Sequence, residues 1–377
     1  VTEGHPDKLC DQIADAILDV CLKQDEQSRV ACEVLATKGT IIVAGEITST
    51  YEPDVFAVVR KVLSDIGYSS EGIAMDTFVH QQSPDIAGAV DTSKERREGV
   101  SDNQIDWFQG AGDQGVMIGY ACDETKQLMP IPVVLANRIV RELSACRQSS
   151  YIQGILPDGK AQVTVEYENG KPVRLDSVVV SCQHTEDKNL KKLEAEIRKK
   201  VLLPALRLLP PDEDTKIFIN PSGRFVCGGM DADTGLTGRK LMVDSYGSMV
   251  PHGGGAFSGK DCSKVDRSVA YMARYIAKNI VAARLASRCQ VSLAYAIGVA
   301  QPVMVQVDTF GTGKVCADDC LELAIPLVFG LTPKQIVDSL RLTRPIFRQT
   351  AAFGHFGRKE FPWERTDKVE ALRNAVI

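Results

Sequence analysis

The stretch AQVTVEYENGKPVRLDSVVVSC, residues 161–182, alternates apolar and polar side chains on both sides of Asn169-Gly170. A period of two is typical of a strand with one buried face, and Asn-Gly between such runs is a strong hairpin signal. The stretch therefore predicts two antiparallel strands joined by a tight turn. Residues 30–48, VACEVLATKGTIIVAGEIT, and residues 289–308 predict two further strand pairs.

Each predicted strand pair has a helical pattern near it in the sequence. One apolar stripe follows Pro6 and consists of Leu9, Ile13, Ile17 and Val20. Another follows Ser263 and consists of Val265, Val269, Met272, Ile276 and Ile280. A third candidate helix covers residues 188–208. Three such units predict an α+β fold of three similar subdomains, each a β-sheet backed by helices. We place the subdomains at residues 1–109, 110–240 and 241–377, with parts that interleave.

Composition excludes several classes of protein. The net charge of −5 disfavours a nucleic-acid partner, because such proteins usually carry a basic field. Residues 289–307 are uncharged and about long enough to span a membrane, but Gln290, Ser292 and Pro302 interrupt them, so we expect buried strands and no membrane span. The eleven cysteines include no CxxC pair. They predict reduced, mostly buried thiols in a cytoplasmic protein.

The glycine-rich stretch VPHGGGAFSGKDCSKVDRS, residues 250–268, raises the question of a phosphate site. Gly254 and Gly259-Lys260 have P-loop spacing, but a P-loop needs Ser or Thr after the lysine, and Asp261 stands there. A P-loop also follows a buried strand directly, and the nearest strand candidate, residues 241–243, ends too early. The stretch is therefore not a P-loop.

The same stretch still favours an anion. Three consecutive glycines, residues 253–255, let backbone N–H groups approach a ligand closely. Ser263 and Asp266 have the spacing of a capping box, which predicts a helix start, and a helix N-terminus attracts negative charge. Lys260, Lys264 and Arg267 would lie near one face of its first turn. The alternative is a flexible loop with solvated charges.

EGHPDK, residues 3–8, predicts a second helix start, because Pro6 suits the first helical position. His5 and Asp7 then lie at a helix N-terminus. A carboxylate beside a bound anion needs a cation between them, so Asp7 indicates a metal such as Mg²⁺. Asp266 raises the same possibility. The alternative for both aspartates is simple capping of a helix.

Three more loops combine glycine with charged residues: GAGDQG (110–115), PDGKAQVT (157–164) and DADTGLTGRK (231–240). Each alone is compatible with an ordinary turn. Together they predict a site for a polyphosphate and divalent cations. The polar residues 91–104 predict a long mobile loop.

With these motifs the chain resembles the S-adenosylmethionine synthetase (methionine adenosyltransferase) family over essentially its whole length. The matching motifs occur in family order: GHPDK (4–8), ACE (31–33), AGEI (44–47), QSPDI (82–86), GAGDQG (110–115), INPSGRFVCGG (219–229), GLTGRK (235–240), HGGGAFSGKDCSKVDRS (252–268) and GHFGRKEFPWE (354–364). Residues 91–109 depart from the family pattern, because they are longer and more charged than expected of this gating loop and include Trp107.

The resemblance implies a fold and a reaction. Three similar subdomains would pack about a pseudo-threefold axis, and a homodimer, or a homotetramer, would share active sites between chains. The methionine sulfur would attack C5′ of ATP in an SN2 displacement. Tripolyphosphate would then be cleaved to phosphate and pyrophosphate. Two Mg²⁺ ions per site and one K⁺ would assist. The rivals are an ATP-dependent kinase or ligase that leaves C5′ intact, and a non-catalytic nucleotide-binding subunit.

The resemblance also implies roles for individual residues. The catalytic residues would be His5, Arg239, Lys260 and Lys264. ATP would be bound by these four and by Asp158, Gly159, Lys160, Ser222, Gly223, Arg224, Phe225, Asp233, Lys240 and Ala256. Methionine would be bound by Glu46, Gln82, Asp113, Asp233 and Lys264. The metal ligands would be Asp7 and Asp266 for Mg²⁺ and Glu33 for K⁺.

Overall fold

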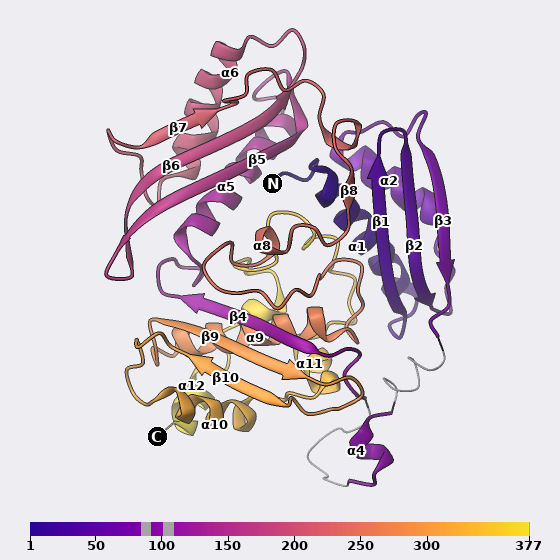
Figure 1. Ribbon diagram of the computed structural model, residues 1–377, viewed down its shortest axis with the longest axis vertical. Coiled ribbons are helices and arrows are strands. Elements are labelled where there is room, and N and C mark those ends of the chain that lie inside the picture. The colour runs from indigo at the N-terminus through magenta and orange to yellow at the C-terminus, as the bar shows by residue number, and fades with distance from the viewer. Residues whose placement is uncertain (84–91, 101–108, 377) are drawn as a thin grey trace.

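The computed structural model describes residues 1–83, 92–100 and 109–376. The described strands form three sheets. Figure 1 shows these sheets around a central region that holds the N-terminus, helix α1 (Pro6–Gln24) and the short helix α8 (Leu241–Asp244). The chain therefore has the predicted α+β fold of three sheet-and-helix subdomains.

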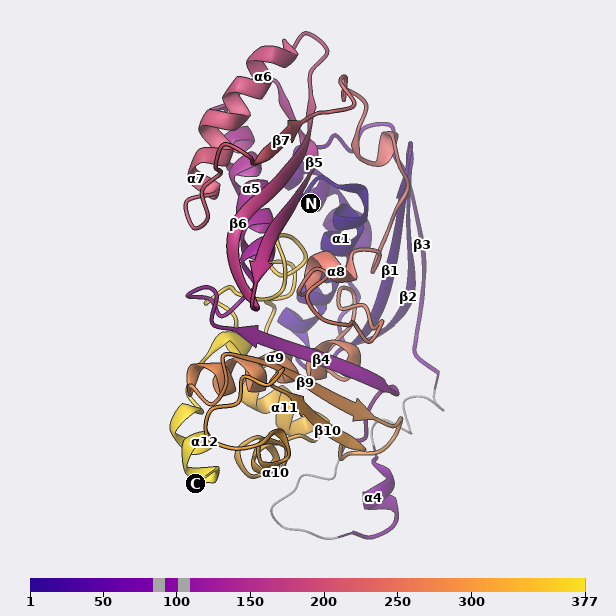
Figure 2. The ribbon, with the colours of Figure 1, turned by 60° about the vertical axis from the view of Figure 1, so that its left-hand side comes forward.

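The N-terminal sheet has the strand order β3-β2-β1-β8. Its strands are β1 (Arg29–Thr37), β2 (Thr40–Thr48), β3 (Ala74–His80) and β8 (Gly235–Leu236). Alternate residues of β1 are buried, and α1 packs against this strand, with α2 (Val55–Ile66) beside it. Figure 2 shows the sheet nearly edge-on, with α1 on the side that faces the centre of the molecule.

The central sheet has the strand order β5-β6-β7. It consists of β5 (Ile155–Glu168), β6 (Lys171–His184) and β7 (Lys216–Ile219), with α5 (Ile131–Gln148) packed against β5. Asn169 and Gly170 have φ values of 51° and 74°, as a type I′ turn requires. The hairpin prediction is therefore confirmed. The predicted third helix is α6 (Leu190–Ile197), which continues through a π-helical turn (Arg198–Leu202) into α7 (Leu203–Ala205).

The C-terminal sheet has the order β10-β9-β4 and is covered by α9 (Val265–Ala282). Its strands are β4 (Gly115–Cys122), β9 (Arg288–Tyr295) and β10 (Met304–Asp308), and the later helices are α10 (Asp318–Val328), α11 (Pro333–Leu340) and α12 (Val369–Ala375). β4 and β8 each join a sheet made mainly of residues distant in the sequence, because Gly115 pairs with Tyr295 and Leu236 with Leu35. The three sheets therefore interleave along the chain.

The uncharged residues 289–307 form strands β9 and β10, as predicted. No single helix in the described ranges is long and apolar enough to cross a membrane. Helices α10 and α11 taken together are long and apolar enough by length and composition, but they are bent by 76° at the break between them.

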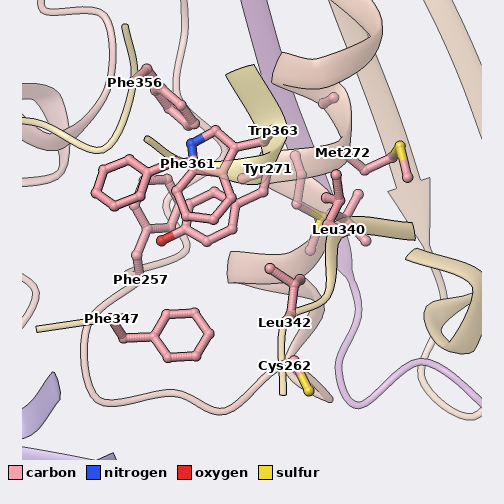
Figure 3. Packing of buried hydrophobic residues seen from close by; sticks show 14 of the residues in the cluster. Phe257, Cys262, Tyr271, Met272, Leu340, Leu342, Phe347, Phe356, Phe361 and Trp363 are labelled. Carbon is pink, nitrogen blue, oxygen red and sulfur yellow. The ribbon is translucent and has the colours of Figure 1, made fainter. Parts of the chain in front are cut away.

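A buried aromatic cluster connects α9, the glycine-rich loop and the C-terminal segment (Figure 3). Tyr271 of α9 stacks on Trp363 with ring centroids 3.7 Å apart, and Phe361 also stacks on Trp363, with ring centroids 4.9 Å apart. Phe257 of the glycine-rich loop is also buried here and lies 5.8 Å from Tyr271. The cluster therefore fixes the loop to the start of α9.

Residues 91–104 differ in part from the predicted loop. Residues 94–97 form the short helix α4 (Lys94–Arg97), capped by the Ser93 side chain. The Glu95 carboxylate accepts hydrogen bonds from the backbone N–H of Ala300 at 3.0 and 3.1 Å, which ties α4 to the C-terminal subdomain. Residue 91 and residues 101–104, with Trp107, lie outside the described residues.

Candidate active site

The GHPDK motif begins α1, and Pro6 is its first residue, as predicted. His5 is the N-cap, and its Nδ1 accepts the backbone N–H of Asp7 at 3.2 Å. A Cβ on Gly4 would lie 2.4 Å from the Cβ of Pro157, so the motif packs tightly against β5. Only glycine allows this approach, which brings His5 beside the PDGK segment.

Asp7 lies among cations at the helix N-terminus. Its Oδ1 accepts the backbone N–H of Leu236 at 3.0 Å, and its Oδ2 pairs with Lys240 Nζ. Arg239 lies 3.8 Å from the same carboxylate. Burial alone would raise the pKa of Asp7, but the bonds from Lys240 and Leu236 outweigh it and lower the pKa. The carboxylate is therefore ionised and is paired with the Lys240 cation.

His5 is neutral at ordinary pH. Burial and the nearby Lys240 charge lower its pKa to about 3, against the weaker opposing effect of Asp7. Because Nδ1 accepts a hydrogen bond, the neutral ring carries its proton on Nε2. His5 can thus donate one hydrogen bond to a ligand without carrying charge.

Asp158 and Lys160 project from β5 near the same helix end. Asp158 Oδ2 accepts the backbone N–H of Gly229 at 2.8 Å, and burial raises the pKa of this carboxyl. The charge of Lys160 opposes this rise in the Asp158 pKa, and the charge of Asp233 adds to it. Lys160 itself is exposed, and its charge also lowers the pKa of His5.

The segment 222–225 adjoins the end of β6. The Phe225 carbonyl accepts the His184 backbone N–H at 2.9 Å, and the Phe225 N–H donates to Nε2 of the His184 side chain at 3.0 Å. Arg224 forms an exposed ion pair with Glu186 at 2.6 Å. Ser222 is exposed, and Gly223 has a φ of 85°, which turns the chain between β7 and Phe225.

The glycine-rich loop follows helix α8, because residues 241–244 are helical. The strand expected at 241–243 is therefore wrong, although the conclusion that no P-loop is present stands. A Cβ on Gly253 would lie 1.7 Å from the Val116 carbonyl oxygen, and one on Gly259 would lie 2.0 Å from that of Cys32. The loop thus lies directly on strands β4 and β1.

Two lysines of this loop pair with carboxylates. Lys260 Nζ contacts Asp266 Oδ2 at 2.5 Å, and Lys264 Nζ contacts Asp261 Oδ2 at 2.7 Å. Each lysine remains partly exposed, with side-chain exposures of 21% and 15%. The loop therefore presents two cations and one accessible carboxylate, Asp266, at the N-terminus of α9.

Two sequence predictions about this helix start are wrong. Lys264, not Ser263, is the N-cap, and its side chain makes no capping bond, because an ammonium group cannot accept a backbone N–H. The Ser263 N–H donates to Asp261 Oδ1 at 2.9 Å, so no capping box forms with Asp266. Arg267 does not point toward a ligand, because it is buried against Asp15.

The remaining predicted residues lie around this loop and the N-terminal sheet. Glu33 is near Lys260, whose charge opposes the rise in pKa that partial burial causes at Glu33. A Cβ on Gly112 would lie 2.6 Å from the Ser263 carbonyl oxygen, which places Asp113 beside the start of α9. Glu46 and Gln82 lie at the ends of β2 and β3, next in sequence to residues that line a cavity of about 580 Å³.

The predicted residues form two groups in one chain. The α1 cluster consists of His5, Asp7, Asp158, Lys160, Arg239 and Lys240. The glycine-loop cluster consists of Glu33, Asp113, Lys260, Lys264 and Asp266. The two meet where a Cβ on Gly238 would lie 2.7 Å from the Ala256 Cβ. In the described part of the chain, no three His, Cys, Asp or Glu side chains converge as a metal site.

Sequence reasoning missed the buried residues that hold these loops. Asp11 and Asp15 of α1 accept backbone N–H groups from Gly238 and Gly259. Lys8, inside the GHPDK motif, is fully buried between Asp11 and Asp244. The spacing of Asp7, Asp11 and Asp15 at intervals of four is a visible signal, since it places all three on one face of a helix.

The fold and the two clusters define an α+β protein whose glycine-rich loops present cations and carboxylates at two helix N-termini, an arrangement suited to phosphate and metal ions. Three domain families match the chain in order. The N-terminal, central and C-terminal domains of S-adenosylmethionine synthetase match residues 1–92, 108–225 and 227–365. The chain belongs to the S-adenosylmethionine synthetase family. It is therefore a transferase, and the family activity is synthesis of S-adenosylmethionine from ATP and methionine.

Proposed function

We propose that this chain makes S-adenosylmethionine by direct displacement at C5′ of ATP and then hydrolyses the released tripolyphosphate. The observation that carries the proposal is the convergence of His5, Asp7, Arg239 and Lys240 at the start of α1. Two separate segments of the chain, residues 3–8 and 235–240, supply these groups, and they combine cations with a carboxylate where a polyphosphate needs both.

The first step needs alignment and charge stabilisation. A lone pair of the neutral methionine sulfur forms the S–C5′ bond while the C5′–O bond breaks, and the electron pair leaves on tripolyphosphate. No general base is required, because the thioether carries no proton to remove. Preorganised cations stabilise charge as it develops on the leaving oxygen. Water then cleaves the tripolyphosphate into phosphate and pyrophosphate.

His5 suits the first step. Its neutral ring carries a proton on Nε2, so it donates a hydrogen bond toward the departing oxygen while Nδ1 remains fixed by Asp7 N–H. Arg239 suits the second step, because a guanidinium binds phosphate oxygens in two places and stays charged at any working pH. Its side chain is about half exposed and reaches outward from the GLTGRK loop.

The residues present fit the metals that the family generally uses, Mg²⁺ and K⁺. Mg²⁺ typically takes one or two carboxylates and completes its shell with water and phosphate oxygens. Asp7 and Asp266 each offer one such carboxylate next to a lysine, and Glu33 offers an oxygen ligand for K⁺. Two bound Mg²⁺ ions would supply positive charge to the triphosphate. We assign these three residues as the metal ligands.

Substrate contacts follow from the two clusters. For ATP we assign Asp158 to Lys160, Ser222 to Phe225, Asp233 and Ala256, together with His5, Arg239, Lys240, Lys260 and Lys264. For methionine we assign Glu46, Gln82, Asp113, Asp233 and Lys264.

We further propose that one active site combines the α1 cluster of one chain with the glycine-loop cluster of another, in a homodimer or a homotetramer. The exposed apolar side chains of Phe78 on β3 and Val116 on β4, with exposures of 64% and 41%, support a subunit contact on these sheets. Activity should then fall on dilution together with loss of the dimer. A fully active monomer in analytical ultracentrifugation would contradict this assembly.

The decisive experiment separates the two chemical steps. The protein is incubated with ATP, methionine, Mg²⁺ and K⁺, and the products are identified by mass and followed by rapid quench. Arg239→Leu should lose ~100-fold or more in tripolyphosphate hydrolysis but much less in a single turnover of sulfonium formation. His5→Asn should show the opposite. A phosphorylated or ligated product with C5′ intact would refute the proposed function, and equal losses in both steps would refute these two roles.

A further inference from the structure

Helix α1 carries four aspartates at intervals of four residues: Asp7, Asp11, Asp15 and Asp19. Such spacing puts them on one face, where like charges destabilise an isolated helix. Asp11 and Asp15 are also completely buried. A buried carboxylate is costly unless it is both paired and hydrogen-bonded, so the partners of these two residues explain why this face tolerates them.

Asp11 holds the GLTGRK loop. Its Oδ1 accepts the backbone N–H of Gly238 at 2.9 Å, and Gly238 directly precedes Arg239. Its Oδ2 accepts from Lys8 Nζ at 2.9 Å, and Lys8 also pairs with the buried Asp244. The buried Lys8 cation therefore holds one oxygen of the Asp11 carboxylate, and the other oxygen holds the loop.

Asp15 holds the glycine-rich loop in the same way. Its Oδ1 accepts the backbone N–H of Gly259 at 2.8 Å, and Gly259 directly precedes Lys260. The Arg267 guanidinium donates to both carboxylate oxygens, at 2.6 and 2.8 Å. Gly259 has a φ of 81° and lies against the Cys32 carbonyl, so its backbone is confined on both sides.

We propose that Asp11 and Asp15 are positioning residues for the two-step reaction: each fixes the backbone from which one catalytic cation, Arg239 or Lys260, projects. The role rests on the proposed function. Neither carboxylate can touch a substrate, because both are fully buried. Hydrogen bonds to a carboxylate are roughly twice as strong as neutral ones, and a small displacement of a catalytic group costs rate heavily.

Asp19 is a matched control on the same face. Its two oxygens accept the backbone N–H groups of Phe347 and Arg348 at 2.8 and 2.9 Å. This third segment carries none of the residues assigned to ATP, methionine or metal. Asp19→Asn therefore changes a partly buried carboxylate that anchors backbone N–H groups in the same way, without touching either catalytic loop.

Amide hydrogen exchange of the full chain tests the anchoring directly and does not depend on activity. In Asp11→Asn, exchange in residues 235–240 should accelerate about tenfold because the charge-assisted bond is weakened, while residues 257–262 keep the wild-type rate. In Asp19→Asn, both loops should exchange as in wild type and activity should be unchanged. Wild-type exchange at residues 235–240 in Asp11→Asn would overturn the inference.

The activity of Asp11→Asn distinguishes positioning from simple loss of folded protein. Tripolyphosphate hydrolysis, assigned to Arg239, should fall about tenfold more than single-turnover sulfonium formation. A smaller folded fraction would slow both steps equally, and that result would overturn the positioning role. If the wild type makes no sulfonium product, the proposed function fails, whereas the exchange data still decide whether the anchors exist.

Asp15 needs a paired variant, because Asp15→Asn alone leaves Arg267 as an unpaired buried charge and endangers folding. Asp15→Asn combined with Arg267→Gln removes both charges. In this double variant, exchange should accelerate in residues 257–262 and stay at the wild-type rate in residues 235–240. Acceleration in both loops to the same extent would show general loosening and overturn the assignment for Asp15.

Discussion

Glu364, in the GHFGRKEFPWE motif, should contribute strongly to stability, and Glu364→Gln tests this. The carboxylate is completely buried and binds the Arg274 guanidinium through both oxygens, at 3.1 and 2.9 Å. It also accepts from Lys278 Nζ at 2.6 Å and from the Gly357 N–H at 2.7 Å. Gln keeps the volume but removes the charge and replaces one accepting oxygen with an NH₂ donor.

The expected loss in the free energy of unfolding follows from the contacts that Arg274 keeps when the charge of Glu364 is removed. Breaking a buried ion pair from one side typically costs about 3–5 kcal/mol, because the other charge stays buried without compensation. Arg274 keeps hydrogen bonds to the carbonyls of Tyr120, Leu128 and Gln127, at 2.7, 2.8 and 2.9 Å. These carbonyls satisfy three of its five N–H groups and carry no charge, so we expect about 3 kcal/mol, the lower end of that range.

Urea denaturation at pH 7 measures this loss as a change in the free energy of unfolding. Glu360→Gln is the control, because Glu360 pairs with Arg358 at 2.9 Å with its own side chain 47% exposed, and such a pair contributes at most about 1 kcal/mol. If Glu364→Gln costs no more than Glu360→Gln, the reasoning about the buried pair is wrong.

The pH dependence of stability gives an independent check on Glu364. Burial alone would raise its pKa, but Arg274 and Lys278 outweigh burial and hold the pKa below its usual value. A carboxyl whose pKa is lower in the folded state stabilises the protein above the unfolded pKa, and this contribution disappears as pH falls through the folded pKa. The difference between wild type and Glu364→Gln should therefore shrink in acid. A constant difference would contradict the assigned interaction.

Two further predictions concern the site. The His5 ring should not titrate between pH 5 and 8 in NMR spectra of the free protein, because its pKa is lowered to about 3. In the unfolded chain the same ring has its ordinary pKa and binds a proton at higher pH than in the folded chain. The free energy of unfolding should therefore fall as pH drops below about 6.5. A step near pH 6.5 would contradict its buried, neutral state. Asp7→Asn and Asp266→Asn should each raise the Mg²⁺ concentration for half-maximal activity about tenfold or more, and mixing the two variants should restore part of the activity if sites span two chains. If the Mg²⁺ dependence is unchanged, the two aspartates are not metal ligands and only contribute negative charge to the first turns of α1 and α9.

Short-range pattern by itself determined most of the secondary structure and the class of chemistry. The Asn169-Gly170 turn, the apolar stripe after Pro6 and the strands of residues 30–48 all depend on neighbours a few residues away, and the structure confirms each. The motifs were sufficient to indicate the family, because glycine loops rich in Lys and Asp occur in a fixed order along the chain. The roles of individual site residues stay predictions.

Only the tertiary structure decided which local signals were realised. Ser263 and Asp266 had the spacing of a capping box, but Asp261 takes the Ser263 N–H, and Asp266 pairs with Lys260. Arg267 has the spacing of a ligand-facing cation, but its side chain is buried against Asp15. The pairing of β4 with β9 likewise has no local signal. Burial and long-range contacts determine which of several possible partners a side chain or strand binds. In this chain those partners lie far apart in the sequence.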